Sequence, residues 1–188
     1  MTAGQVFQRL TSVLERVGIP YMLSGSFASA YYGTTRSTQD IDLVIEATPA
    51  KLEALARQLP QDEYYIELTV ALEAYEQQSL FNVIDRATGW KIDLIIRKAR
   101  AFSQEEFRRR RQITLHGVPV FVASAEDVII SKLEWSKLSE SQRQLEDASS
   151  ILRSRWDQLD RVYLKKWLAA LQLESQWKSA IEKAGVNE

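Results

Sequence analysis

The order in which strand-like and helix-like patterns follow one another constrains the fold of this chain most. Short apolar runs typical of strands fall among helical repeats up to Ser124. Over residues 125–183 the apolar side chains recur only at helical spacing. Strands mixed with helices, followed by helices alone, predict an α+β fold. We expect residues 1–123 to form a mixed sheet flanked by helices, and residues 124–188 to form a helical subdomain packed on this core.

The composition excludes several kinds of site. The 188 residues include 24 Lys and Arg against 25 Asp and Glu, so a net charge of −1 gives no global field that would attract nucleic acid or an anionic membrane. There is no cysteine, which excludes disulfides, thiolate zinc sites and cysteine nucleophiles. No apolar run approaches bilayer-spanning length, and residues 1–14 lack a signal-peptide pattern. We expect a soluble cytoplasmic protein with no membrane partner.

Two carboxylates stand two residues apart in the strand predicted at residues 40–46. Because side chains alternate along a strand, Asp40 and Asp42 share one face and the apolar residues share the other. Neighbouring carboxylates repel each other unless a cation lies between them. A third acid, Asp93, lies on the polar face of the strand predicted at residues 90–97. If these strands are neighbours, three carboxylates converge, as two Mg²⁺ ions need when a triphosphate supplies further oxygens.

A turn of small residues precedes the acids. Gly25 and Ser26 follow a short apolar strand and precede a helical segment, for which we expect Ser26 to be the N-cap. Glycine lets the backbone approach a phosphate closely, and a helix N-terminus offers free N–H groups and a favourable dipole. A phosphate cradle beside a carboxylate cluster is suited to phosphoryl or nucleotidyl transfer.

This set of residues resembles the nucleotidyltransferase superfamily of DNA polymerase beta. The matching positions are Gly25-Ser26, Arg36-x-Thr38-x-Asp40-x-Asp42 and Lys91-x-Asp93. The resemblance covers about residues 20–152, and within the superfamily the chain is most similar to small bacterial proteins of the AbiEii toxin type. Minimal antitoxin-like members read Gly-Ser-x-Ala-Arg-Gly before the acids, whereas the arginine of this chain comes only at Arg36.

The resemblance implies an enzyme of nucleotidyltransferase-like α+β fold with two Mg²⁺ ions. It would bind ATP or another NTP and transfer NMP to an acceptor hydroxyl, with release of pyrophosphate. Asp40, Asp42 and Asp93 would be the catalytic and metal-binding residues, with Asp93 assisting deprotonation of the acceptor. The acceptor could be a tRNA end, a protein or a small molecule such as an antibiotic.

Two alternatives use the same residues. The first is a non-catalytic nucleotide-binding partner of a toxin–antitoxin pair, which would bind a cognate toxin or antitoxin. The second is hydrolysis of a phosphoester at the same metals.

The candidate nucleotide-binding residues are Gly25, Ser26, Arg36, Lys132 and Asp147. Helical geometry places Lys132 in the middle of an apolar stripe, so its side chain faces inward. There it either extends out to solvent or reaches a phosphate or carboxylate where the two subregions meet. Asp147 matches the family's downstream Asp by resemblance, and a local ion pair with Arg143 explains it equally well.

Three other features are interpreted as structural. We expect Asp85, beside a turn, to be solvated, and Trp135 to pack among leucines at helical spacing. The arginine run at residues 108–111 is expected to face water, with nucleic-acid contact as the alternative.

Overall fold

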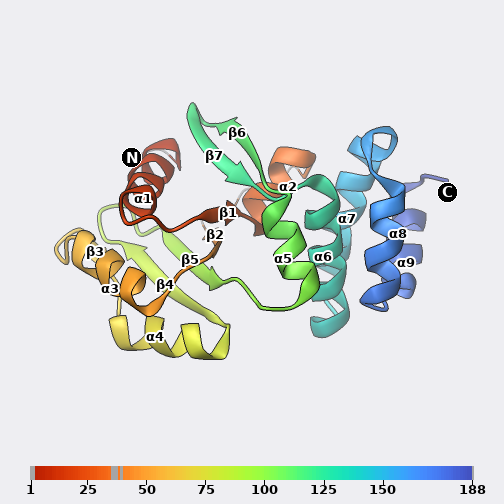
Figure 1. Ribbon diagram of the computed structural model, residues 1–188. Helices are drawn as coiled ribbons and strands as arrows, with labels where there is room; N and C mark the ends of the chain where they lie inside the picture. The colour runs from red at the N-terminus through yellow and green to blue at the C-terminus, as the bar shows by residue number, and fades with distance from the viewer. Residues whose placement is uncertain (1–2, 35–37, 39, 188) are drawn as a thin grey trace. The chain divides into compact units, whose positions relative to one another are not determined.

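The computed structural model describes residues 3–34, 38 and 40–187. In chain order its elements are α1 (Ala3–Arg16), β1 (Tyr21–Leu23), α2 (Gly25–Tyr32), β2 (Asp40–Ile45), α3 (Pro49–Gln58), β3 (Tyr64–Tyr65), α4 (Leu68–Gln77), β4 (Leu80–Asp85), β5 (Lys91–Ile96), α5 (Ala101–Arg108), β6 (Arg111–Leu115), β7 (Val118–Val122), α6 (Ala125–Ser139), α7 (Gln142–Arg155), η1 (Trp156–Gln158), α8 (Arg161–Ala170) and α9 (Glu174–Ala184) (Figure 1). The predicted α+β fold with a helical C-terminal part is confirmed.

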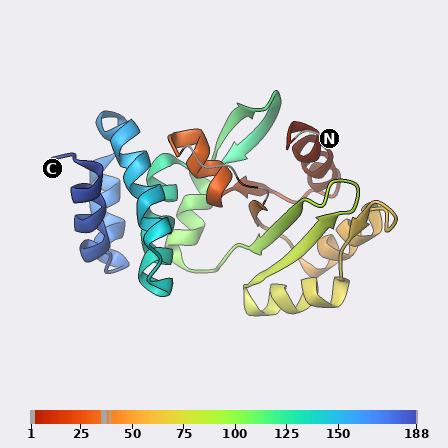
Figure 2. The same ribbon diagram turned by 180° about the vertical axis from the view of Figure 1, so that it is seen from behind.

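Within the described residues, seven strands form one mixed sheet in the order β3-β4-β5-β2-β1-β7-β6. The central neighbours β2 and β5 are parallel, whereas β4 runs antiparallel to β5 and β1 antiparallel to β2. Figures 1 and 2 show α1 and α3 on one face of this sheet. Neither of these two helices covers the opposite face of β4 and β5. Alternate strand residues are fully buried, namely Ile41, Leu43, Ile92 and Leu94. The apolar residues that alternate with polar ones in the sequence of these strands are therefore the ones that face the core.

The chain divides into two compact units. One contains the sheet with α1, α3, α4 and α5, and the other contains α2 with α6 to α9. Two contacts hold α2 against the C-terminal helices. Tyr32 Oη donates to the carbonyl of Ala123 at 2.8 Å. Gly33, directly after α2, lies so close to Ser154 of α7 that an added Cβ would be 2.3 Å from Ser154 Oγ. The predicted domains differ from these units in the placement of α2, and the boundary after residue 123 stays a prediction.

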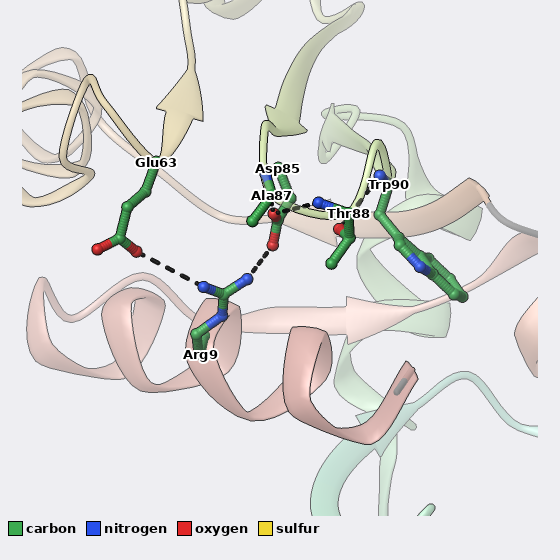
Figure 3. Close-up of polar contacts among 6 residues, drawn as sticks. All are labelled: Arg9, Glu63, Asp85, Ala87, Thr88 and Trp90. Carbon is green, nitrogen blue, oxygen red and sulfur yellow. Dashed lines mark hydrogen bonds and ion pairs between the residues drawn. The ribbon is translucent and has the colours of Figure 1, made fainter. Parts of the chain in front are cut away.

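Asp85, at the end of β4, is buried, so the prediction that it is solvated is wrong. Its carboxylate accepts hydrogen bonds from the backbone N–H groups of Ala87 at 3.0 Å and Thr88 at 3.2 Å, and it forms an ion pair with Arg9 of α1. Figure 3 shows Arg9 between Asp85 and Glu63, whose carboxylate lies 3.5 Å away. These contacts fix the turn between β4 and β5 and tie it to α1.

The second unit contains a buried ion pair. Lys132 Nζ of α6 lies 2.8 Å from Asp147 Oδ2 of α7, and the two residues are 5% and 3% exposed. The prediction that Lys132 faces inward is confirmed, and its partner there is Asp147. Burial of two charges is tolerated because each neutralises the other.

Trp135 is 57% exposed, so the prediction that it packs among leucines is wrong. At 100° per residue it lies about 60° from Lys132 around α6, at the margin of the apolar stripe. No helix in the described part of the chain is long and apolar enough to cross a membrane.

Replacing Asp85 by Ala should lower the free energy of unfolding by about 2–4 kcal/mol, because Arg9 and two turn N–H groups lose their acceptor. Urea unfolding followed by circular dichroism measures this change. Glu63→Ala is the matched control, since its exposed ion pair with Arg9 should contribute at most about 1 kcal/mol. Equal effects of the two substitutions would contradict a structural role specific to Asp85.

Lys132→Met should lower the free energy of unfolding by about 3–5 kcal/mol, because it leaves the Asp147 carboxylate buried without its cation. The double variant Lys132→Met/Asp147→Leu should recover much of this loss, which a double-mutant cycle in urea would show. Lys183→Met is the control, since Lys183 forms an exposed pair with Glu146. Additive effects of Lys132→Met and Asp147→Leu would show that the two side chains do not stabilise each other.

Candidate active site

The parallel pairing of β2 with β5 brings the predicted acids onto one face of the sheet. Asp42 lies directly opposite Asp93 in the register, and Asp40 lies opposite Lys91. Neighbouring strands are about 4.8 Å apart, so opposite residues on one face are side by side. The condition on which the predicted convergence of the acids depends, that the two acid-bearing strands are neighbours, is met. We call Asp40, Asp42, Lys91 and Asp93 the acid row.

Burial increases over the three acids of the row, from Asp40 through Asp42 to Asp93. Asp40 is exposed at the start of β2, Asp42 is half-buried, and Asp93 is only 9% exposed. A carboxylate this far from water needs compensating donors, because burial disfavours its charged form. The contacts of Asp93 supply them.

Both carboxylate oxygens of Asp93 are engaged. Asn82 Nδ2 of β4 donates to Oδ1 at 2.5 Å, and Lys91 Nζ donates to Oδ2 at 3.0 Å. Asn82 lies opposite Asp93 in the antiparallel register of β4 with β5. The sequence analysis missed Asn82, although counting outward from the predicted turn between the two strands would have placed it beside Asp93. Asn82 holds one oxygen of this carboxylate in a fixed direction.

Lys91 supplies positive charge to the acid row. The pKa of its ammonium group is raised chiefly by the hydrogen bond to Asp93, and the negative charges of Asp93, Asp40 and Asp42 raise it further, while partial burial opposes the shift. The ammonium is therefore firmly protonated near neutral pH. Its charge offsets part of the repulsion among the three carboxylates.

The acid row has the right chemistry for Mg²⁺ without being a preformed cage. Among the residues that the structure describes, no group of three or more His, Asp or Glu side chains is arranged to hold a metal ion. Mg²⁺ prefers oxygen ligands and usually takes one or two protein carboxylates, with waters and substrate phosphates completing its shell. Asp42 and Asp93, adjacent on neighbouring strands, can supply two such carboxylates. The predicted site with three protein ligands stays a prediction.

The predicted phosphate turn begins a helix, two residues earlier than expected. Helix α2 starts at Gly25, so Ser26 lies in its first turn and the predicted N-cap is wrong. Gly25 has a φ of 59°, in the left-handed region that favours glycine. The preceding residue, Ser24, donates its backbone N–H to the carbonyl of Asp42 at 2.9 Å, so the strand that leads to this turn is bonded to the strand of the acids.

The other predicted nucleotide-binding residues belong to the second unit or lie outside the described residues. Arg36 lies outside the described residues. Gly25, Lys132 and Asp147 belong to the second unit, whereas the acid row belongs to the first. Their convergence on one substrate stays a prediction.

The arginine run at residues 108–111 is engaged locally. Arg108 forms an ion pair of 2.6 Å with the neighbouring Glu105. The guanidinium of Arg110 lies 4.3 Å from the ring centroid of Phe107 and donates to the carbonyl of the same residue at 2.6 Å. These contacts hold the side chains of Arg108 and Arg110 against α5, and nucleic-acid contact by the run stays a prediction.

No protein-family model matches the chain, and no curated protein matches it in sequence. Solved structures match it in fold. The antibiotic-resistance factor ANT(2'')-Ia, in complex with adenylyl-2''-tobramycin, matches 93% of this chain and 99% of its own, with a TM-score of 0.58 at 14% identity. The lincosamide antibiotic adenylyltransferase LnuA, bound to lincomycin, matches 80% of this chain and 96% of its own, with a TM-score of 0.55 at 15% identity.

An antigenic nucleotidyltransferase-like protein from Paracoccidioides brasiliensis is similar to 96% of this chain over 92% of its own, with a TM-score of 0.52 at 18% identity. Identities this low carry the fold and no further property. The seven-stranded mixed sheet and its helices therefore have the nucleotidyltransferase fold.

Proposed function

We propose that this protein is a metal-dependent nucleotidyltransferase that moves NMP from an NTP to an acceptor hydroxyl and releases pyrophosphate. The observation that carries the proposal is the register of β2 with β5, in which Asp42 faces Asp93 on the polar side of the sheet. The fold shared with two antibiotic-modifying enzymes supports it, since their names include adenylyl transfer or an adenylylated product.

The residues divide into two proposed roles. Asp42 and Asp93, with Asp40 beside them, would hold Mg²⁺, which when bound neutralises charge on the phosphates. Asp93 would accept the proton of the acceptor hydroxyl while the oxygen of that hydroxyl bonds to the α-phosphorus. The bond from that phosphorus to the bridging oxygen breaks, and pyrophosphate carries away the electron pair.

The second role is to bind the triphosphate. Gly25 and Ser26, at the start of α2, would direct backbone N–H groups at the phosphates, and Arg36 would add a cation. Lys132 and Asp147 complete the proposed nucleotide-binding set. Their ion pair holds α6 against α7.

The acceptor is proposed to be a small molecule, a tRNA end or a protein. A small-molecule acceptor is the first to test, because the two antibiotic-modifying enzymes named above share the fold over most of this chain. Fractionated lysate presents all three kinds together.

Incubation with each of the four α-labelled NTPs, Mg²⁺ and fractionated lysate should transfer label to an acceptor and release pyrophosphate. Asp42→Asn and Asp93→Asn should each slow transfer by about 100-fold or more, since each removes a charge that metal and proton transfer require. Asp62→Asn, which changes an exposed acid outside the row, should leave the rate unchanged.

Full activity of Asp93→Asn would contradict this assignment. Release of inorganic phosphate in place of pyrophosphate would show hydrolysis instead. Failure of every NTP to bind or label anything would overturn the catalytic proposal.

A non-catalytic nucleotide-binding partner of a toxin–antitoxin pair is the second candidate. One observation favours it: both oxygens of Asp93 are already engaged, by Asn82 and by Lys91. The presence of all three acids argues against it. NTP binding without turnover, together with a stable complex with the protein encoded next to this one, would support this candidate over the first.

A further inference from the structure

Lys91 lies inside the acid row. It starts β5 opposite Asp40 and shares a strand face with Asp93, two positions further along. Its Nζ is 3.0 Å from Asp93 Oδ2, and its charge also interacts with Asp40 and Asp42. A single side chain therefore provides positive charge to all three acids of a row proposed to hold a dication.

At this position the Lys91 side chain can move away from Asp93. Its side chain is 46% exposed, so the ammonium can turn into solvent without opening the apolar core. Asp93 stays oriented when this happens, because Asn82 holds the other oxygen at 2.5 Å. The two partners of Asp93 therefore differ: one is an amide fixed within β4, and the other is a flexible cation at the surface.

A metal ion on Asp93 and the ammonium of Lys91 compete for the same oxygen. Mg²⁺ binds carboxylate oxygen at about 2.1 Å. With Nζ 3.0 Å from the same atom, the two cations would be at most about 5 Å apart, where like charges repel strongly. Metal binding at this oxygen therefore favours movement of the ammonium away from Asp93.

We infer that Lys91 is the internal counter-ion of the acid row, which a divalent metal ion displaces from Asp93 while Asn82 keeps that carboxylate oriented. The inference rests on the proposed function and deepens it, since it states what must move before the metal binds. Lys91 is a positioning residue here, because it acts through Asp93.

The direct test measures metal affinity in the full chain without nucleotide, by titration with Mn²⁺ and detection of free Mn²⁺ by electron paramagnetic resonance. Lys91→Met should bind Mn²⁺ about five- to twentyfold more tightly than the unmodified protein, because it removes one nearby positive charge from a partly exposed site. Lys91→Arg keeps the charge and should not show this gain. Lys98→Met, an exposed lysine beyond the end of β5, is the matched control and should change nothing.

Unchanged or weaker Mn²⁺ binding by Lys91→Met would overturn the inference, since it would mean that Lys91 does not compete with metal. Circular dichroism and the urea midpoint show that the variant is folded. If transfer activity is intact while metal affinity is unchanged, this inference alone fails. If the protein binds no divalent metal and transfers nothing, the proposed function fails with it.

A second measurement needs no substitution. Acetylation of Lys91 by an activated ester, quantified by peptide mass spectrometry, should become several-fold faster at saturating Mn²⁺, because displacement frees the ammonium from Asp93. Lys98 in the same samples should react at an unchanged rate. Equal rates at Lys91 with and without metal would also overturn the inference.

Discussion

The hydrogen-bonded register between β2 and β5 is the constraint on which the rest of the candidate site depends. It places Asp42 opposite Asp93 and Asp40 opposite Lys91 on one face, and on the other it buries apolar residues such as Ile41 and Ile92. A slip of one residue would turn the acids of one strand into the core, at a large cost in desolvation. The apolar core and the acid row therefore require the same register.

Two ion pairs of buried charged residues join elements that are separate in sequence. Asp85 is paired with Arg9, 76 positions earlier, and also accepts two N–H groups of its own turn. Lys132 is paired with Asp147 on the next helix. Each pair joins two elements at one defined position, because misalignment would leave a buried charge without its partner.

Asp93 is held differently from these two structural pairs. Its partners are a neutral amide on the adjacent strand and the ammonium of a lysine whose side chain is nearly half exposed. A neutral donor orients a carboxylate without cancelling its charge, whereas an exposed cation can be exchanged. This combination suits a carboxylate that has to receive a metal ion, and it distinguishes Asp93 from Asp85.

The sequence by itself determined the elements, the polar face of each acid-bearing strand and the inward direction of Lys132, because alternation and helical periodicity are local properties of the chain. It also supplied the nucleotidyltransferase-like α+β fold. Only the tertiary structure decided that β2 and β5 are neighbours, that Asp85 is buried in an ion pair with Arg9, and that Asn82 donates a hydrogen bond to Asp93. Pairing between strands and ion pairs between elements join residues far apart in sequence, so no local pattern specifies them.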